Sequence, residues 1–174
     1  MFINRQALKR IFFITIGELV KVVESLGYAG AFIAGFLGTS SIFLSIFPSF
    51  LVIMALGTKL NPLLVGILGG IGSGIGQFTH YYIGYAGRYV VSESRKKQFD
   101  EFGKKLNKYG VLLIFLFAAT PLTPDDLVWI PLGAMNYPKL KALLAAIAGK
   151  IILNLVYAYS GYYGIKLLLR WLGT

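Results

Sequence analysis

The sequence contains no cysteine and a single histidine, His80. Disulfide scaffolds, iron–sulfur clusters and cysteine-based zinc sites are therefore excluded, and one histidine is too few for a histidine-rich metal site. The chain also lacks a Ser–His–acid order, an HExxH pair and a kinase signature. We expect no metal, no cofactor and no enzymatic activity.

Charged residues are scarce and mostly of one sign. They make up 14% of the 174 residues against 56% hydrophobic residues, and 17 Lys and Arg stand against 7 Asp and Glu. Soluble domains carry about 25% charged residues, so a soluble protein is excluded. The basic residues gather in short stretches between long uncharged runs, which is typical of membrane proteins and not of nucleic-acid binding. No nucleic-acid partner is expected.

The uncharged runs extend over residues 25–58, 60–87, 109–124 and 142–165, with Lys150 alone inside the last. Because a helix needs about 20 apolar residues to cross the hydrocarbon, these runs predict membrane segments.

Two other segments have the pattern of amphipathic helices lying in the membrane interface. Residues 11–26 place Glu18 and other polar residues on one face. Residues 92–108 repeat Phe99, Phe102 and Leu106 along one face against a strongly basic face. Such helices bury the apolar face and contact lipid headgroups with the basic one.

The segment 27–57 is too long for one ordinary span and too short for two spans with a turn. Hydroxyl residues and Pro48-Ser49 interrupt it, which favours a re-entrant hairpin of two half-length helical arms. The segment 109–133 has the same design and is interrupted by Thr120-Pro121-Leu122-Thr123-Pro124-Asp125-Asp126.

Prolines and a glycine recur with one spacing. Three pairs of residues are each 76 positions apart: Pro48 and Pro124, Gly57 and Gly133, and Pro62 and Pro138. The predicted fold is one all-α integral membrane domain over residues 1–174. It is an inverted repeat of two re-entrant hairpins, each followed by a transmembrane helix at 60–88 or 138–166. Basic residues are nearly balanced between the two sides, so they do not set the orientation.

Small and aromatic residues predict packing and interface contacts. Gly66, Gly70 and Gly74 form one ridge on the first span and Gly72 and Gly76 another, and we expect this glycine face to receive a hairpin arm. Arg88 is expected to snorkel to the surface at the end of that span. Interfacial belts are expected from Trp129, Trp171, Tyr157, Tyr159, Tyr162 and Tyr163.

Asp125 and Asp126 are the leading site candidates, because adjacent carboxylates in an apolar segment need protonation, pairing or hydration. Lys150 lies near the middle of the last span and could meet a carboxylate there. Three readings are open: a structural ion pair, a proton- or substrate-handling site, and a hairpin tip that lies among the lipid headgroups. Adjacent aspartates point to different faces of a helix, which argues against a hydrolytic dyad.

Further polar residues occur on both spans: Gln77, His80 and Tyr81 on the first, and Asn154 on the second. His80 could titrate near neutral pH and serve a proton relay, or it could be a hydrogen-bonded packing residue.

Four stretches resemble the DedA, or VTT-domain, membrane family, also called SNARE-associated Golgi proteins. Gly76-Gln77-Phe78-Thr79-His80-Tyr81-Tyr82-Ile83-Gly84 is similar to the family's Gly-Asp-x-x-x-Tyr-x-Ile-Gly. The other stretches are Lys108-Tyr109-Gly110, Phe117 to Pro121 and Pro131-Leu132-Gly133. The resemblance covers roughly residues 20–165.

The chain also departs from the family pattern. Gln77 replaces an Asp, Ser49-Phe50 stand where an acidic residue is usual, and alanine at 118 or 119 replaces an Arg. The family's following Arg falls near Pro124-Asp125, so the charge at the second tip is reversed in sign. The matched positions are Gly76, Tyr81, Gly84 and Pro121.

The resemblance implies movement of lipids, either transport of polyprenyl-phosphate carriers or scrambling of phospholipids. The expected partners are anionic lipid headgroups, with protons or cations as coupling ions, and a homo-oligomer is compatible with this. The expected location is the plasma membrane, multi-pass, with cytoplasmic termini. The alternatives are a proton- or ion-coupled small-solute carrier and a non-transporting membrane scaffold. The candidate path residues are Asp125, Asp126, Lys150, Thr120, Pro121, Thr123, Pro124, Ser49, Pro48, Gln77, His80, Tyr81 and Asn154.

Overall fold

The computed structural model describes residues 18, 21–23, 25–40, 49–106, 109–121 and 126–172. All regular structure within these residues is helical, which confirms the predicted all-helical class. The helices are α2 (Gly27–Ser40), α3 (Ser49–Lys59), α4 (Pro62–Gly87), the 3-10 helix η1 (Arg88–Val90), α5 (Glu93–Leu106), α6 (Gly110–Ala119), α7 (Asp126–Ala134) and α8 (Lys139–Leu172). The interfacial helix predicted at 11–26 lies largely outside the described residues.

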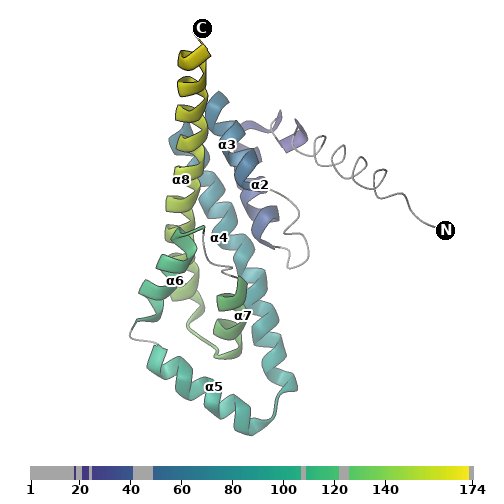
Figure 1. The fold of residues 1–174 in the computed structure, drawn as a ribbon. Helices are drawn as coiled ribbons and strands as arrows, with labels where there is room; N and C mark the ends of the chain where they lie inside the picture. Colours follow the sequence, from purple (N-terminus) through teal and green to yellow (C-terminus); the bar gives the residue numbers. More distant parts are fainter. Residues whose placement is uncertain are drawn as a thin grey trace, which may run out of the picture.

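Two of the described helical stretches are long and apolar enough to cross a membrane, Pro62–Val90 and Lys139–Gly164. They correspond to α4 and α8, which extend along most of the molecule in Figure 1. Helix α8 continues to Leu172, past the predicted end at residue 166, because no proline follows Pro138 to interrupt it.

Local sequence signals set the ends of these helices. The Asn61 side chain caps α4 by accepting a hydrogen bond from the Leu63 amide at 2.9 Å, and Pro62 occupies the first turn. Helix α7 ends where Asn136 adopts a left-handed backbone with φ 51°. The Asn136 amide then donates to Gly133 O at 3.0 Å and the Tyr137 amide to Leu132 O at 3.1 Å. This Schellman pattern satisfies the last carbonyls of α7 and turns the chain into α8.

Glycines bring α4 and α8 into close antiparallel contact. The contacts join Gly66 to Leu155, Gly70 to Ile151 and Gly74 to Ile147. The prediction that this ridge receives a hairpin arm is wrong, since its partner is the other long helix. The neighbouring ridge of Gly72 and Gly76 does receive the short helix α2, through Phe32 and Phe36. Glycines on two faces of α4 allow it to pack closely on both sides.

Helices α2, α3, α6 and α7 each pack mainly on one of the two long helices, as Figure 1 illustrates. Helix α2 lies on α4 and α6 lies on α8, whereas α3 lies on α8 and α7 lies on α4. The arms α3 and α7 approach the long helices closely at glycines: Gly57 meets Ala158, Gly161 meets Met54, Gly133 meets Tyr81 and Gly84 meets Ile130.

Two hydrophobic clusters stand out in the described part of the chain. One gathers residues of α2, α3, the start of α4 and the later part of α8, including Val65 and Ala158. The other gathers residues of α4, α6, α7 and the start of α8, including Tyr81 and Trp129. The prediction of Trp129 in an interfacial belt is wrong, because its ring is buried between α7 and α4.

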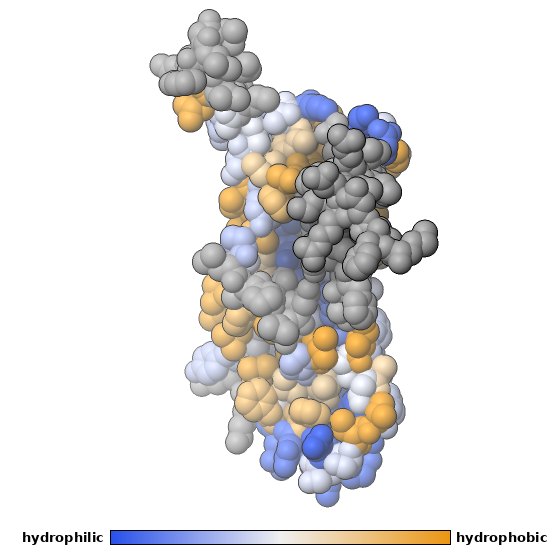
Figure 2. Space-filling view, turned by 45° about the vertical axis from the view of Figure 1, so that its right-hand side comes forward, coloured by the Kyte–Doolittle hydropathy of each residue, from blue (hydrophilic) through white to orange (hydrophobic). Residues whose placement is uncertain are grey.

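Helix α5 crosses the lower end of the molecule in Figure 1, and hydrophilic residues gather at that end of the face seen in Figure 2. Hydrophobic residues are spread over the middle of the same face. This distribution is expected when the middle of a protein lies in hydrocarbon and its end in the headgroup region.

Candidate functional site

Polar side chains are buried on both long helices, α4 and α8. Among the described residues they are Ser73, Gln77 and His80 of α4 and Lys150 and Asn154 of α8. Gln77 and His80 are 0% exposed and Lys150 is 6% exposed. We call these residues the polar site. It lies between the two hydrophobic clusters, because Val65 and Tyr81 flank it on α4 and Ala146 and Ala158 flank it on α8.

Asn154 connects the two helices inside the polar site. Its side-chain nitrogen donates to Lys150 O at 2.8 Å and to Ser73 Oγ at 3.4 Å. The close contact of Gly70 with Ile151 lets the two backbones approach, so that these short side chains can meet.

Lys150 lies eleven residues after Lys139, about 16 Å along α8 at a rise of ~1.5 Å per residue. That distance is about half the thickness of a ~30 Å hydrocarbon layer. A buried ammonium at such a depth is costly, and ionisable residues placed there usually serve substrate, ion or proton pathways.

Two short helices end beside the polar site from different sides. At the end of α2, Thr39 Oγ1 donates to Ser73 O at 2.8 Å, and Thr79 Oγ1 donates to Ser40 O at 2.7 Å. At the end of α6, Ala118 and Ala119 approach Gly149, which precedes Lys150. Both helix ends are therefore level with the buried polar groups.

A comparison with protein-family models matches residues 47–163 to the VTT domain, which is the domain of the DedA and SNARE-associated Golgi proteins. The chain belongs to the VTT-domain family. The resemblance seen in the sequence is thereby confirmed, and together with the two apolar helices it makes this a membrane protein. The matched region contains the whole polar site, and VTT-domain proteins are generally not enzymes. Searches of curated proteins and of solved structures gave no match to the chain.

The structure gathers some of the predicted path residues of this VTT domain and separates others. Gln77, His80, Lys150 and Asn154 are all buried on α4 and α8 and belong to the polar site. Pro48, Thr123, Pro124 and Asp125 lie outside the described residues, and of Asp126 only the backbone, at the start of α7, is described.

The remaining predicted residues lie at the ends of short helices or in the core. Thr120 and Pro121 are exposed after the end of α6. Ser49 is half-buried at the start of α3, where it packs against Gly38 near the end of α2. Tyr81 is fully buried in the second hydrophobic cluster.

The position of Tyr81 indicates a structural role in the VTT domain. Its hydroxyl donates to Tyr137 O at 2.6 Å and thereby fixes the turn between α7 and α8. Its ring stacks on Phe78 with ring centres 5.1 Å apart. The Tyr137 hydroxyl is also buried, against Gly110, and has no hydrogen-bond partner among the described residues. This burial raises the pKa of Tyr137.

These two tyrosines should respond in opposite ways to loss of the hydroxyl. Tyr81→Phe removes a buried hydrogen bond and leaves Tyr137 O unsatisfied, so we expect a loss of about 1–2 kcal/mol. Tyr137→Phe removes an unpartnered buried hydroxyl and should leave stability unchanged or raise it. Unfolding of both variants in detergent, followed by circular dichroism, measures the difference. Equal destabilisation by the two changes would contradict this assignment.

Arg88 has a role that the sequence did not reveal. Its guanidinium binds both carboxylate oxygens of Asp100 at 2.7 Å and donates to Ala134 O at 2.9 Å. It therefore connects the end of α4 to α5 and to the last residue of α7. The predicted snorkelling Arg88 is instead part of a bidentate ion pair, which has a stronger geometry than a single contact. The signal in the sequence was Asp100, an acidic residue within a mostly basic helix.

Asp100→Asn should loosen the attachment of α5. The Arg88 guanidinium holds the pKa of Asp100 below its usual value, so the pair stabilises the fold above about pH 4 and the effect is lost as pH falls further. We expect severalfold faster hydrogen exchange in residues 93–106 of Asp100→Asn at neutral pH, measured by mass spectrometry. Glu93→Gln removes an exposed pair with Lys96 and should leave α5 unchanged. Equal exchange in Asp100→Asn and the unmodified protein would refute the attachment.

No group of three His, Asp or Glu residues that could hold a metal ion occurs in the described segments. The polar site contains one lysine together with amide, hydroxyl and imidazole side chains. Such a set can bind and release an anionic group.

Proposed function

We propose that this VTT domain moves lipids across the membrane by letting a phosphate-bearing headgroup pass the polar site. The lipid is a phospholipid or a polyprenyl phosphate. The observation that carries the proposal is the buried Lys150, with Asn154 and Gln77, at mid-span depth beside the ends of α2 and α6.

The proposal requires that the hairpins enter the membrane without crossing it. Helices α2, α3, α6 and α7 contain 14, 11, 10 and 9 residues, and each is shorter than the ~20 residues that a span needs. The ends of α2 and α6 lie level with the middle of the long helices. Half-length arms with polar tips are tolerated where they face protein or water, which favours re-entrant hairpins.

Corresponding contacts support an inverted repeat. A shift of 76 residues takes Met54 and Gly57 of α3 to Ile130 and Gly133 of α7. The α7 residues contact Gly84 and Tyr81 of α4. A shift of 77 takes these two α4 residues to Gly161 and Ala158 of α8, which contact the α3 residues. A shift of 83 for Phe32 and of 77 for Gly72 takes their contact to that of Phe115 with Gly149. The shifts differ because the connecting segments differ in length.

The same correspondence pairs Ser73 with Lys150 and Gln77 with Asn154, so four of the five residues of the polar site are two equivalent positions from each half. Sites at the interface of inverted repeats are typical of transporters. The two halves differ in charge, since only the second supplies an ammonium group at this position. That charge favours an anionic headgroup over a cation.

In this proposal the headgroup crosses at the polar site while the acyl chains stay in lipid. Asp125, Asp126, Thr120, Thr123 and Ser49, which the sequence places at the hairpin tips, hydrate the headgroup on either side. The protein acts in the plasma membrane with cytoplasmic termini, as the family resemblance implies.

Liposomes containing the purified full chain test the proposal. Fluorescent phospholipid in both leaflets is quenched from outside with a reductant, and faster loss of the inner-leaflet signal than in protein-free vesicles is expected. A fluorescent polyprenyl phosphate serves as the second substrate. Folded protein that accelerates neither lipid would rule out the proposal. Small-solute flux without lipid movement would indicate a carrier, and neither activity would indicate a scaffold.

A further inference from the structure

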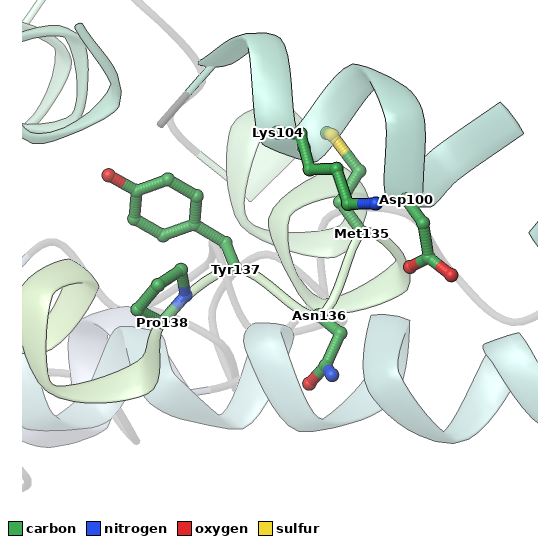
Figure 3. A pocket seen from close by; sticks show the side chains of 7 residues that line it. Asp100, Lys104, Met135, Asn136, Tyr137 and Pro138 are labelled. Carbon is green, nitrogen blue, oxygen red and sulfur yellow. The ribbon is translucent and has the colours of Figure 1, made fainter. Parts of the chain in front are cut away.

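A polar cavity of about 250 Å³ lies where α5 crosses the turn between α7 and α8. Asp100 and Lys104 line it from α5, and Met135 and Asn136 line it from the turn. Figure 3 shows Lys104 extended along α5 toward Asp100, with the turn carrying Asn136 beneath. This cavity is separate from the polar site, which lies at mid-span on α4 and α8.

The walls of the cavity are held in place by hydrogen bonds. The amides of Asn136 and Tyr137 bind back to α7, and the Tyr81 hydroxyl fixes Tyr137 O. On the other side, Arg88 holds Asp100 and Ala134 together and so fixes α5 against the end of α7. A cavity with fixed walls loses little conformational entropy when it binds a ligand.

The cavity offers both hydrogen-bond donors and hydrogen-bond acceptors. Lys104 supplies an ammonium group and Asn136 an amide donor, whereas Asp100 and the Met135 carbonyl are acceptors. The Arg88 guanidinium balances the Asp100 carboxylate, so the charge that remains is that of Lys104. A matching ligand carries a phosphate with one negative charge and, next to it, a group that donates hydrogen bonds.

The position of the cavity indicates that the ligand is a lipid. It lies between the end of the α4 span at Val90 and the beginning of the α8 span at Lys139, which is the depth of the headgroups. Just along α8, Leu140 and Leu144 are 67% and 58% exposed, which suits contact with acyl chains. Tyr89 and Val90 are also strongly exposed at this end.

We propose that this cavity binds the headgroup of a phosphodiester lipid whose alcohol carries a hydrogen-bond donor, as glycerol and ethanolamine do and choline does not. The phosphate contacts Lys104 and Asn136, and the hydroxyl or ammonium group contacts Asp100. The site anchors a lipid beside the second hairpin, and its existence does not depend on transport through the polar site.

Native mass spectrometry of the full chain in detergent tests this site. Phosphatidylglycerol, phosphatidylethanolamine and phosphatidylcholine with identical acyl chains are titrated separately. We expect the first two to bind about tenfold more tightly than the third, because choline cannot donate the further hydrogen bond that glycerol or ethanolamine gives to the Asp100 carboxylate. Equal binding of all three lipids would overturn the proposal.

Variants assign the binding to this cavity. Lys104→Met should weaken phosphatidylglycerol binding about tenfold by removing a charged hydrogen bond. Asn136→Gly removes the amide and preserves the left-handed turn, so it should weaken binding severalfold without unfolding. Lys97→Met, at an exposed position of α5 outside the cavity, is the matched control and should bind normally. Equal binding by Lys104→Met and Lys97→Met would refute the site.

Water-soluble glycerophosphoglycerol distinguishes the source of the phosphodiester. If the site serves membrane lipid, the soluble compound binds far more weakly than the intact lipid. If both bind with similar affinity, the lipid assignment is overturned and the ligand is a soluble phosphodiester. The liposome assay on Lys104→Met separates this site from transport, because lipid movement should continue when this cavity is altered.

Discussion

Lys150→Met is expected to slow protein-dependent transbilayer movement of phospholipid by about ten- to a hundredfold. The ammonium of Lys150 is the cationic group of the polar site, and a charge-assisted hydrogen bond to phosphate contributes about 1.5–3 kcal/mol. Methionine has a similar length and no charge, so the change removes the attraction for phosphate and preserves the packing. The measurement is the quenching rate of fluorescent phospholipid in liposomes with equal amounts of folded protein.

Lys141→Met is the matched control for this change. Lys141 is a lysine of the same helix, but its side chain is exposed near the start of α8. Its replacement should leave the transport rate unchanged. Normal transport by folded Lys150→Met would show that the substrate does not need the Lys150 ammonium.

Gly70→Ala should lower the free energy of unfolding by about 3 kcal/mol. A methyl group at this position would contact the Ile151 backbone, with its nitrogen only 2.6 Å away. Backbone atoms cannot move aside as the end of a side chain can, so α4 and α8 would have to separate. Their separation would also open the contact of Asn154 with Ser73 in the polar site. The midpoint of thermal unfolding in detergent measures the loss.

Gly87→Ala is the control for the general effect of replacing a helical glycine. A methyl group at Gly87 would meet nothing within 4 Å, and alanine is a better helix former than glycine. Its unfolding midpoint should be unchanged or slightly higher. If Gly70→Ala unfolds at the same temperature as Gly87→Ala, the close contact between α4 and α8 is not needed for the fold.

The sequence by itself determined the class of the protein and the position of its long helices. Uncharged runs of sufficient length predict membrane helices because the cost of a charge in hydrocarbon depends on the segment alone. Asn61 and Pro62 likewise predict the start of α4, because capping involves only neighbouring residues. The burial of Lys150 could be anticipated for the same reason.

Only the tertiary structure decided which helix faces meet. Glycine ridges on two faces of α4 indicated close packing, but they did not show that Gly70 faces α8 and Gly72 faces α2. Trp129 was expected at the membrane interface, but its side chain is buried. Arg88 was expected to extend to the membrane surface, but its guanidinium forms an ion pair with Asp100. These contacts join residues distant in the sequence, and their partners depend on the angle and register at which helices cross. Local sequence patterns carry no information on either quantity.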